Sequence, residues 1–270
     1  MEENIITSVQ NARIKHVVAL QQKSSLRREE GLFVVEGQRE IEHCIACGYE
    51  IVELFTSQCV RHILRSDLTK CLTPCEVSAQ VYEKIAYRGS TEGIIAVARC
   101  KSHDLSLITH RLSLHSNPLI VVLECVEKPG NLGAILRSAE AAGVDAVIVC
   151  DPLTDLYNPN LIRASIGGIF SVPTATCSSE ACITFLKEKG IRILTAQLQD
   201  SYDYYDYDMT QPTAIVMGTE STGLTDIWRQ AADAHIRIPM LGLLDSLNVS
   251  VSAAILMYEA VRQRKTKMKK

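Results

Sequence analysis

The chain has 270 residues, 47% of them hydrophobic and 22% charged, and a formal net charge of −3 at pH 7, which is ordinary material for two globular domains. No stretch approaches the roughly 18 uninterrupted apolar residues of a membrane span, and the opening residues MEENIITSVQ are acidic and polar, unlike a signal peptide. These features exclude a membrane-spanning protein and predict a cytoplasmic one, in which only local basic clusters could meet a polyanionic partner.

Residues 1–100 predict a small α/β domain. Helices near 11–22 and 39–47 alternate with the strands LFVVEG and IVELFTS, and the β-branched strand EGIIAVARC follows the turn-like YRGST. The polar stretch 101–117 is read as a linker to the next domain. Basic residues gather in RIKH (13–16), KSSLRR (23–28) and the tail RQRKTKMKK (262–270), each of which alone could be a solvated face or a frayed terminus.

Ten cysteines raise the question of a metal site or disulfides. They are scattered singly along the chain, and the one close pair, Cys44 and Cys47, has no second CxxC to complete four ligands. Cys59 with His62 is an equally weak hint. We therefore predict no metal, and reduced cysteines that act as small, buried apolar residues.

The second domain, residues 118–265, alternates strands with helices and precedes a basic tail at 266–270. Its strands LIVVLE, DAVIVC, RILTAQ, TAIVMG and HIRIPM are short and apolar, and helices are expected near 131–142, 158–167, 179–189 and at the end. Such strands between helices indicate a parallel sheet covered on both faces. No GxGxxG follows the first strand and no GxxxxGK[ST] occurs, which argues against a Rossmann dehydrogenase or a P-loop enzyme. The acidic DSYDYYDYD (200–208) is read as a loop.

The first segment with chemical potential is EKPGNLGAILRSAEAAGVDAVIV. Asn131 follows Pro-Gly at the expected N-cap, and Gly143 stands at the expected C-terminal end of the helix. Arg137 comes five residues after the apolar Leu132, roughly 140° around the helix, and points away from the packing face. It would lie near the crevice where α/β sheets bind ligands, although an exposed helix arginine is the simpler alternative.

Two further segments follow later strands. In AIVMGTESTGLTDIW the strand breaks at Gly218 into a loop with Glu220, either a satisfied loop carboxylate or a site residue. In IPMLGLLDSLNVSVSAAILMYEAVRQR a glycine-containing loop precedes a helix capped by Ser246 or Asn248, and Ile238 and Leu247 could supply apolar walls for a flat base. That helix is apolar all round, so we expect it to pack on the sheet and on another subunit.

In this order and spacing, the three segments resemble the motifs of the SpoU (TrmH) family of RNA ribose 2'-O-methyltransferases, within the SPOUT class. GLFVVEG and EGIIAV are similar to the substrate-binding domain of that family. The resemblance implies a carboxyl-terminal parallel sheet with a trefoil knot, an amino-terminal α/β RNA-binding domain, S-adenosylmethionine as cofactor, rRNA or tRNA as substrate, and a homodimer with the last helix in the interface.

Site residues are carried over by the same resemblance. The candidate catalytic residues are Arg137, Asn131, Glu220, Ser246 and Asn248. The candidate cofactor-binding residues are Gly218, Ile238, Leu247, Met217 and Met240. The candidate RNA-binding residues, which would contact phosphates, are Arg13, Lys15, Lys23, Arg27 and Arg28.

The implied reaction is in-line attack of a ribose 2'-oxygen on the donor's methyl group. Because guanidinium normally stays charged, we expect Arg137 to polarise the hydroxyl or the adjacent phosphate, with Asn131 and Glu220 orienting it. Two alternatives stay open: a catalytically silent RNA-binding or ribosome-assembly dimer, and a methyltransferase that acts on a base or a protein.

Overall fold

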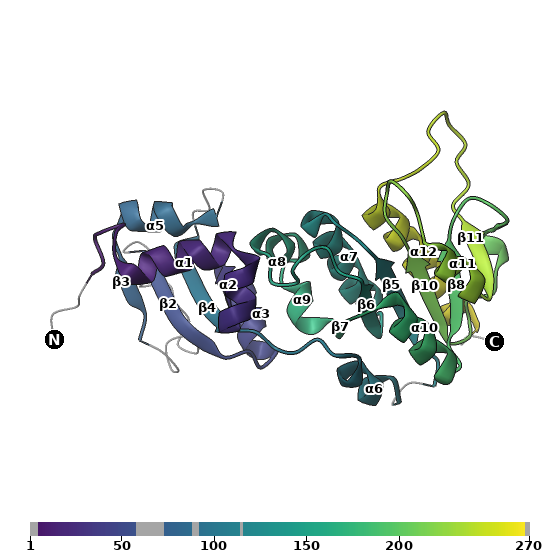
Figure 1. Ribbon diagram of the computed structural model, residues 1–270, viewed down its shortest axis with the longest axis horizontal. Helices are drawn as coiled ribbons and strands as arrows, with labels where there is room; N and C mark the ends of the chain where they lie inside the picture. Colours follow the sequence, from purple (N-terminus) through teal and green to yellow (C-terminus); the bar gives the residue numbers. More distant parts are fainter. Residues whose placement is uncertain (1–4, 58–72, 88–91, 114–115, 268–270) are drawn as a thin grey trace. The chain divides into compact units, whose positions relative to one another are not determined.

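The computed structural model describes residues 5–57, 73–87, 92–113 and 116–267 (Figure 1). The chain divides into two compact units, Met1–Ser102 with Asp155–Phe170, and His103–Thr154 with Ser171–Lys270. Cys59, His62, most of the YRGST turn and residues 268–270 of the predicted tail lie outside the described residues. Within those described ranges, none of the helices combines the length and the apolar character that crossing a bilayer requires.

The first unit is built on a four-stranded mixed sheet in the order β1-β4-β2-β3. Strand β4 pairs antiparallel with both β1 and β2, whereas β3 runs parallel to β2. Its strands are β1 (Leu32–Glu36), β2 (Ile51–Ser57), β3 (Cys75–Val77) and β4 (Ile94–Arg99). Its helices are α1 (Ala12–Gln22), α2 (Ser24–Glu30), α3 (Gln38–Ala46), α5 (Ala79–Ile85) and α8 (Pro159–Ser165), and α9 (Gly168–Ser171) ends at the unit boundary.

Helices α1 and α5 form the core of this unit with one face of the sheet. Ile14, Val17 and Leu20 recur every three residues along α1 and are fully buried against Val34 and Phe55 of the strands. Asn11 caps α1 by accepting a hydrogen bond from the Arg13 backbone N–H, as its position before the helix predicts.

The second unit contains a seven-stranded parallel sheet in the order β7-β6-β5-β10-β8-β11-β9. Its strands are β5 (Leu119–Glu124), β6 (Ala146–Cys150), β7 (Thr174–Cys177), β8 (Arg192–Ala196), β9 (Tyr202–Asp203), β10 (Thr213–Met217) and β11 (Ala234–Arg237). Its helices are α6 (Leu105–Ser113), α7 (Pro129–Ala142), α10 (Ser179–Glu188), α11 (Asp226–Ala231) and α12 (Val249–Lys267), with a short 3-10 turn η2 (Tyr204–Asp206). The predicted α/β class with a parallel sheet is confirmed.

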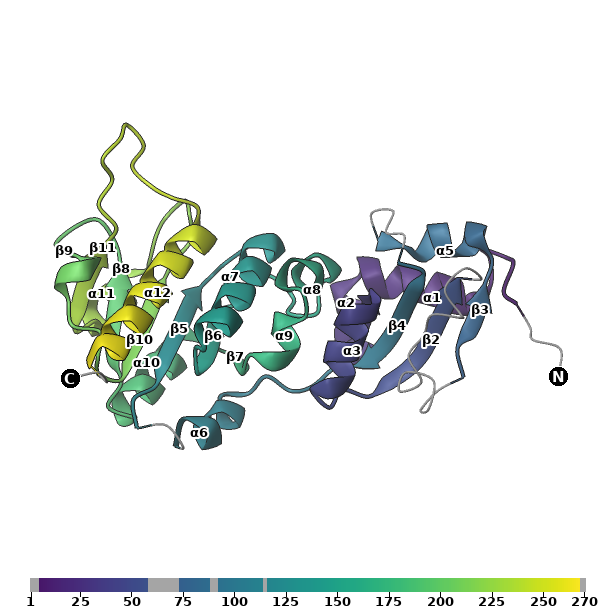
Figure 2. The ribbon, with the colours of Figure 1, turned by 180° about the vertical axis from the view of Figure 1, so that it is seen from behind.

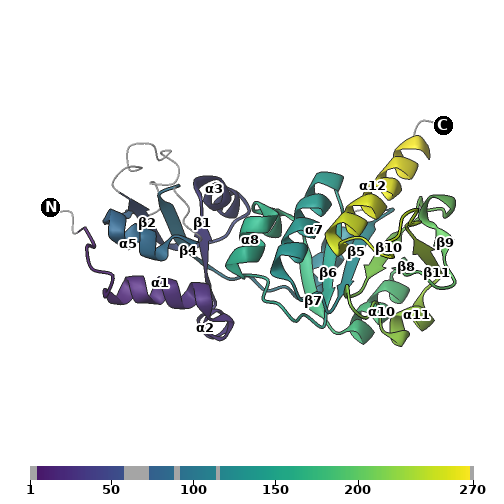
Figure 3. The ribbon, with the colours of Figure 1, turned by 90° about the horizontal axis from the view of Figure 1, so that it is seen from above.

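Helices cover both faces of this sheet (Figures 2 and 3). Helices α6, α10 and α11 pack on one face, where Ile108, Leu186 and Trp228 meet the strand residues Ile120 and Val122. Helices α7 and α12 lie together on the other face. The central strands β5, β6 and β10 are buried along their whole length, which explains their uniformly apolar sequences.

Several details differ from expectation. The stretch 101–117, read as a linker from its polarity, contains α6, because Ile108 and Leu112 pack into the core of the second unit. Helix α7 begins at Pro129, with Lys128 as its N-cap, so Asn131 lies in the first turn and is not the cap. Gly143 does end α7 in the left-handed conformation at φ 67°, as predicted.

Helix α12 is not buried all round within one chain. Asn248 caps it by accepting a hydrogen bond from the Ser250 backbone N–H, which decides between the two expected caps. Ala253, Leu256, Met257 and Ala260 form a buried stripe at helical spacing. The opposite face exposes apolar side chains.

Candidate active site

The carboxyl ends of β10, β8 and β11, which are neighbours in the parallel sheet, meet at one edge, and the residues that follow them line a pocket of about 370 Å³. Its lining comes from residues 196–199 at the end of β8, 217–224 at the end of β10, and 236–238, Met240 and 245–247 at the end of β11 and in the loop that follows it. The first two turns of α12 add Val249, Ser252 and Leu256. This edge of an open α/β sheet is where such folds bind ligands.

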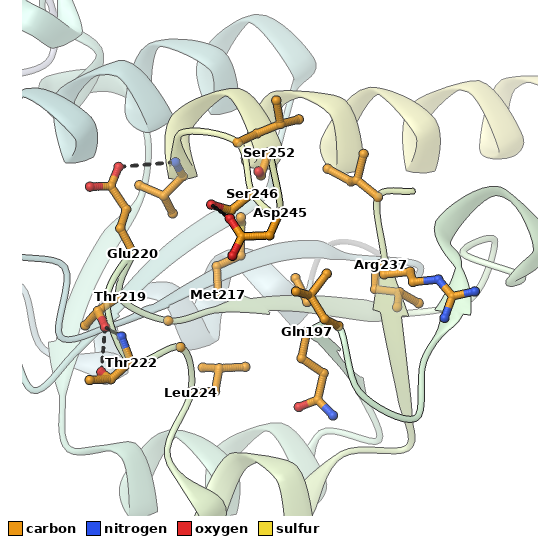
Figure 4. A pocket seen from close by; sticks show the side chains of 18 of the residues that line it. Gln197, Met217, Thr219, Glu220, Thr222, Leu224, Arg237, Asp245, Ser246 and Ser252 are labelled. Carbon is orange, nitrogen blue, oxygen red and sulfur yellow. Dashed lines mark hydrogen bonds between the residues drawn. The ribbon is translucent and has the colours of Figure 1, made fainter. Parts of the chain in front are cut away.

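All five candidate cofactor-binding residues line this pocket. Met217 is the buried last residue of β10 and Gly218 follows it, while Ile238, Met240 and Leu247 come from the loop between β11 and α12. Figure 4 labels Met217, Asp245 and Ser246 among the side chains that line this pocket. Arg237 also lines the pocket, but its guanidinium points away and donates to Asp203 Oδ1 at 2.7 Å.

Gly218 is required by close backbone contact. A Cβ atom at this position would collide with the Gly223 carbonyl and would lie 2.6 Å from the Leu224 backbone nitrogen. The loop therefore folds back on its own start, and only glycine leaves room for that approach.

Hydrogen bonds inside the loop hold this shape. The backbone amides of Thr219 and Gly223 donate to each other's carbonyl oxygens at 3.2 and 3.1 Å, and the Thr219 and Thr222 hydroxyls lie 2.7 Å apart. The Thr222 backbone N–H also donates to the Thr219 hydroxyl at 3.0 Å. The loop after β10 is thus a pre-formed wall of the pocket.

A polar cluster joins this loop to the first turns of two helices. Glu220 Oε1 accepts from the side-chain amides of Asn131 on α7 at 2.9 Å and of Asn248 before α12 at 2.8 Å. Lys128 Nζ donates to Glu220 Oε2 at 2.7 Å. Lys128, Asn131 and Glu220 border a second hollow of about 130 Å³, which shares residues 218–221 and Val249 with the larger pocket.

Lys128 was missed by the sequence analysis. The available signal was its place directly before the Pro-Gly that opens α7, since the first turn of that helix also carries Asn131. Hydrogen bonds from Lys128 and from the Val249 backbone N–H lower the pKa of Glu220. The hydrogen bond to Glu220 in turn raises the pKa of Lys128. Glu220 is therefore a carboxylate at neutral pH and a weak proton acceptor, suited to orienting its neighbours.

The other two candidate catalytic residues, Ser246 and Arg137, lie in different places. Ser246 lines the large pocket, and its hydroxyl donates to Asp245 Oδ1 at 3.3 Å. Arg137 is exposed on α7 and lines neither pocket. Within one chain, Arg137 is therefore not brought together with Asn131, Glu220 and Asn248.

The candidate RNA-binding residues divide in two. Lys15, Lys23 and Arg28 are exposed, and Arg13 is half-exposed while its Nε donates to Glu53 at 3.3 Å. Arg27, in contrast, is 3% exposed, pairs with Asp155 at 2.5 Å and donates to the Leu20 carbonyl oxygen. The expectation that Arg27 contacts phosphates is wrong, because its guanidinium is already used inside the unit.

Three cysteines with sulfur atoms close together lie elsewhere in the second unit. The sulfur atoms of Cys150, Cys177 and Cys182 are within 4.8 Å of one another, at the ends of β6 and β7 and on α10. The eight described cysteines are free, and three of them are buried while five are partly buried. Three thiols of this kind could hold a soft cation, whereas the sequence analysis expected no metal.

Comparison with known proteins places this geometry in a family context. Residues 118–258 match the model of the SpoU rRNA Methylase family, and residues 11–96 match that of the MRM3-like substrate binding domain. A 23S rRNA (uridine(2479)-2'-O)-methyltransferase of Streptomyces viridochromogenes is 31% identical over 96% of this chain and 92% of its own length. The 23S rRNA (guanosine-2'-O-)-methyltransferase RlmB of Vibrio parahaemolyticus is 36% identical over 74% of this chain and 82% of its own.

A solved structure gives the same picture for the whole chain. The SpoU methyltransferase AviRb from Streptomyces viridochromogenes, in complex with the cofactor AdoMet, superposes with a TM-score of 0.83 at 28% identity. The match covers 95% of this chain and all of that one, at 100%. Both units, and not only the sheet with the pocket, therefore have counterparts in that protein.

Proposed function

The chain belongs to the SpoU rRNA Methylase family, and from this premise we propose that it transfers a methyl group from S-adenosylmethionine to a ribose 2'-hydroxyl of 23S ribosomal RNA. The enzyme class, an RNA 2'-O-ribose methyltransferase, follows from the family and its relatives. The choice of 23S rRNA extends the activity of those relatives to this chain. The observation that carries the proposal is the pocket after β10 and β11, which the second and third motif segments line, while Asn131 of the first segment joins the polar cluster beside it.

The pocket fits the proposed donor in size and chemistry. A volume of about 370 Å³ lies within the range of small-molecule sites. Met217, Ile238 and Leu247 would supply apolar walls for the adenine ring, and Gly218 lets the loop after β10 fold back on itself to form one wall of the pocket. When bound, the donor supplies an electrophilic methyl group.

The residues around the pocket would position and polarise the acceptor. A ribose hydroxyl is a poor nucleophile, so the site must orient it and ease the loss of its proton. Glu220, already ionised and bound by Lys128 and two asparagines, would keep Asn131 and Asn248 in fixed orientations. Arg137, which is exposed and lines neither pocket of its own chain, would act as a permanent cation on the 2'-hydroxyl or its neighbouring phosphate when RNA is bound.

The first unit would hold the RNA. It matches a substrate-binding domain and carries the exposed cations Lys15, Lys23 and Arg28. Such cations contact phosphates, which fix the position of the RNA without reading its sequence. A ribosomal substrate also supports the cytoplasmic location expected from the sequence.

Two finer features belong to the same proposal. We expect the carboxyl-terminal segment to be threaded as in the SPOUT knot, which is supported by the loops 217–224 and 236–247 lining one pocket. We also expect a homodimer with α12 in the interface, which is supported by exposed apolar side chains on that helix and on the loop before it. The exposed side chains are Leu241, Leu243, Leu244, Val251 and Tyr258.

Substitution of Arg137 tests the proposal. Arg137→Ala and Arg137→Lys should lower the transfer of a labelled methyl group to ribosomal RNA by about 10³-fold, within the range for a group that assists proton transfer. Calorimetric binding of S-adenosylmethionine should stay within about twofold, because Arg137 lines neither pocket. Lys187→Ala, an exposed cation on α10, is the control and should change neither quantity.

The outcome also separates the alternatives. Loss of donor binding in the Arg137 variants would make Arg137 structural. A wild-type chain that binds RNA, but does not bind S-adenosylmethionine and transfers no labelled methyl group, would be the catalytically silent RNA-binding protein. Mass mapping that places the new methyl group on a base would contradict the ribose assignment.

A further inference from the structure

Glu124 is a buried carboxylate that the motifs do not explain. It is the last residue of β5 and is 3% exposed, next to the strand β10 that leads into the loop 217–224, here called the donor loop. Burying a charged group costs free energy unless hydrogen bonds satisfy it, so its partners show what the group is for.

Thr225 satisfies most of that carboxylate. Its backbone N–H donates to Glu124 Oε2 at 2.9 Å and its hydroxyl donates to Glu124 Oε1 at 2.6 Å. The Ser179 hydroxyl has a single proton, which the 2.6 Å contact to Asp151 uses, so its 3.3 Å contact to Glu124 is secondary. Trp228 Nε1 in turn donates to the Ser179 oxygen at 3.1 Å.

The contact with Thr225 replaces a local bond that the sequence favours. Thr225 is the N-cap of α11, where a threonine side chain usually accepts from the first turn, yet it makes no such bond. Its hydroxyl is turned to Glu124, one hundred and one residues earlier in the chain. The long-range contact therefore determines how the chain leaves the donor loop.

The geometry points to Glu124 as a positioning residue for the methyl donor, acting through Thr225; this inference rests on the proposed function. Residues 217–224 line the pocket, and Thr225 directly follows them. One end of this loop is fixed by β10 and by the tight packing of Gly218 on Gly223. Glu124 fixes the other end, so the wall of the pocket keeps its shape before the donor enters.

The test separates donor affinity from chemistry in the full-length enzyme. Glu124→Gln keeps the size of the side chain but offers one acceptor oxygen in place of two, so the KM for S-adenosylmethionine should rise about tenfold. The kcat at saturating donor should stay within about twofold, because no reacting group is touched. Thr225→Val, which loses only the hydroxyl, should raise KM about threefold, and Thr225→Ser should restore it.

Asp145→Asn is the matched control. Asp145 is also a buried carboxylate, 8% exposed, but it accepts from the Leu119 backbone N–H at the opposite end of β5. It should lower the melting temperature without changing KM for the donor. Trp228 is the only tryptophan, so its fluorescence should change in Glu124→Gln and not in Asp145→Asn.

Each outcome has one reading. An unchanged KM in both Glu124→Gln and Thr225→Val, or an equal rise in Asp145→Asn, would overturn the inference. If Glu124→Gln does not fold, the Thr225 pair decides alone. If the wild-type enzyme neither binds the donor nor methylates RNA, the proposed function fails, which differs from failure of the Glu124 variants alone.

Discussion

Arg27 and Arg28 are adjacent in α2 but have opposite environments. Arg27 is 3% exposed and paired with Asp155, whereas Arg28 is exposed. Arg27→Ala should destabilise the protein by about 3–5 kcal/mol, because it leaves the largely buried Asp155 carboxylate without its partner. Thermal unfolding checks this value, and a loss below about 1 kcal/mol would contradict it.

Arg28→Ala should behave in the opposite way. Its unfolding temperature should match the wild type, while RNA binding should weaken and the slope of log K against log salt should fall by about one. Filter binding over a series of salt concentrations measures both. An unchanged slope would exclude Arg28 from phosphate contact.

Glu220 carries a pH prediction. Its folded pKa lies below the ordinary value of 4.5, so its contribution to stability is complete above that value and is lost as the pH falls through the lower folded pKa. The melting-temperature difference between wild type and Glu220→Gln should therefore be constant from pH 6 to 8, at most about 4 °C, and should vanish in more acidic solution. A difference that changes between pH 6 and 8 would be inconsistent with this assignment.

The sequence identified part of the polar cluster and missed the rest for a physical reason. Asn131, Glu220 and Asn248 stand in the motif segments, which predict them as site residues. Lys128 and Glu220 are 92 positions apart in the sequence, and Glu124 and Thr225 are 101 apart. No local sequence pattern indicates that such distant residues are in contact. Arg27 was misread because a basic cluster does not show which of its members is buried.

At the scale of elements, the donor loop depends on one glycine. Gly218→Ala should destabilise the protein by about 1–3 kcal/mol and abolish donor binding, because the new Cβ meets the backbone of Gly223. Gly242→Ala, in the loop between β11 and α12, is the control, since a Cβ at this position has no atom within 4 Å. Donor calorimetry and thermal unfolding test the pair, and equal behaviour of the two variants would rule out the steric argument.

The apolar strands were predictable and the short elements were not. Strands β5, β6 and β10 are buried on both faces, so their sequences are uniformly apolar. Strand β9 has two residues, and α11 has six, too few to show a period. The sequence does not predict helix α6, because its buried residues Ile108 and Leu112 lie among serine, threonine, histidine and arginine, which give the segment a polar composition.

At the scale of the whole molecule, the second unit exposes apolar side chains of the kind that form interfaces between chains. Leu241 and Leu243 are 98% and 105% exposed, and Val251 and Tyr258 lie seven residues apart on α12 at 48% and 49%. Side chains seven positions apart share one face of a helix, so this face is continuous along two turns. A second copy of the chain would bury it in a two-fold interface.

If the proposed homodimer forms through α12, the double variant Val251→Asp with Tyr258→Asp should convert it to a monomer. Carboxylates on both sides of the interface would lose their hydration and repel one another, and no opposite charge would offset that cost. Sedimentation equilibrium at micromolar concentration measures the change, with Leu107→Asp, a 55% exposed leucine on α6, as the control. A wild-type monomer, or a double variant that stays dimeric, would show that α12 is covered by something other than a second copy.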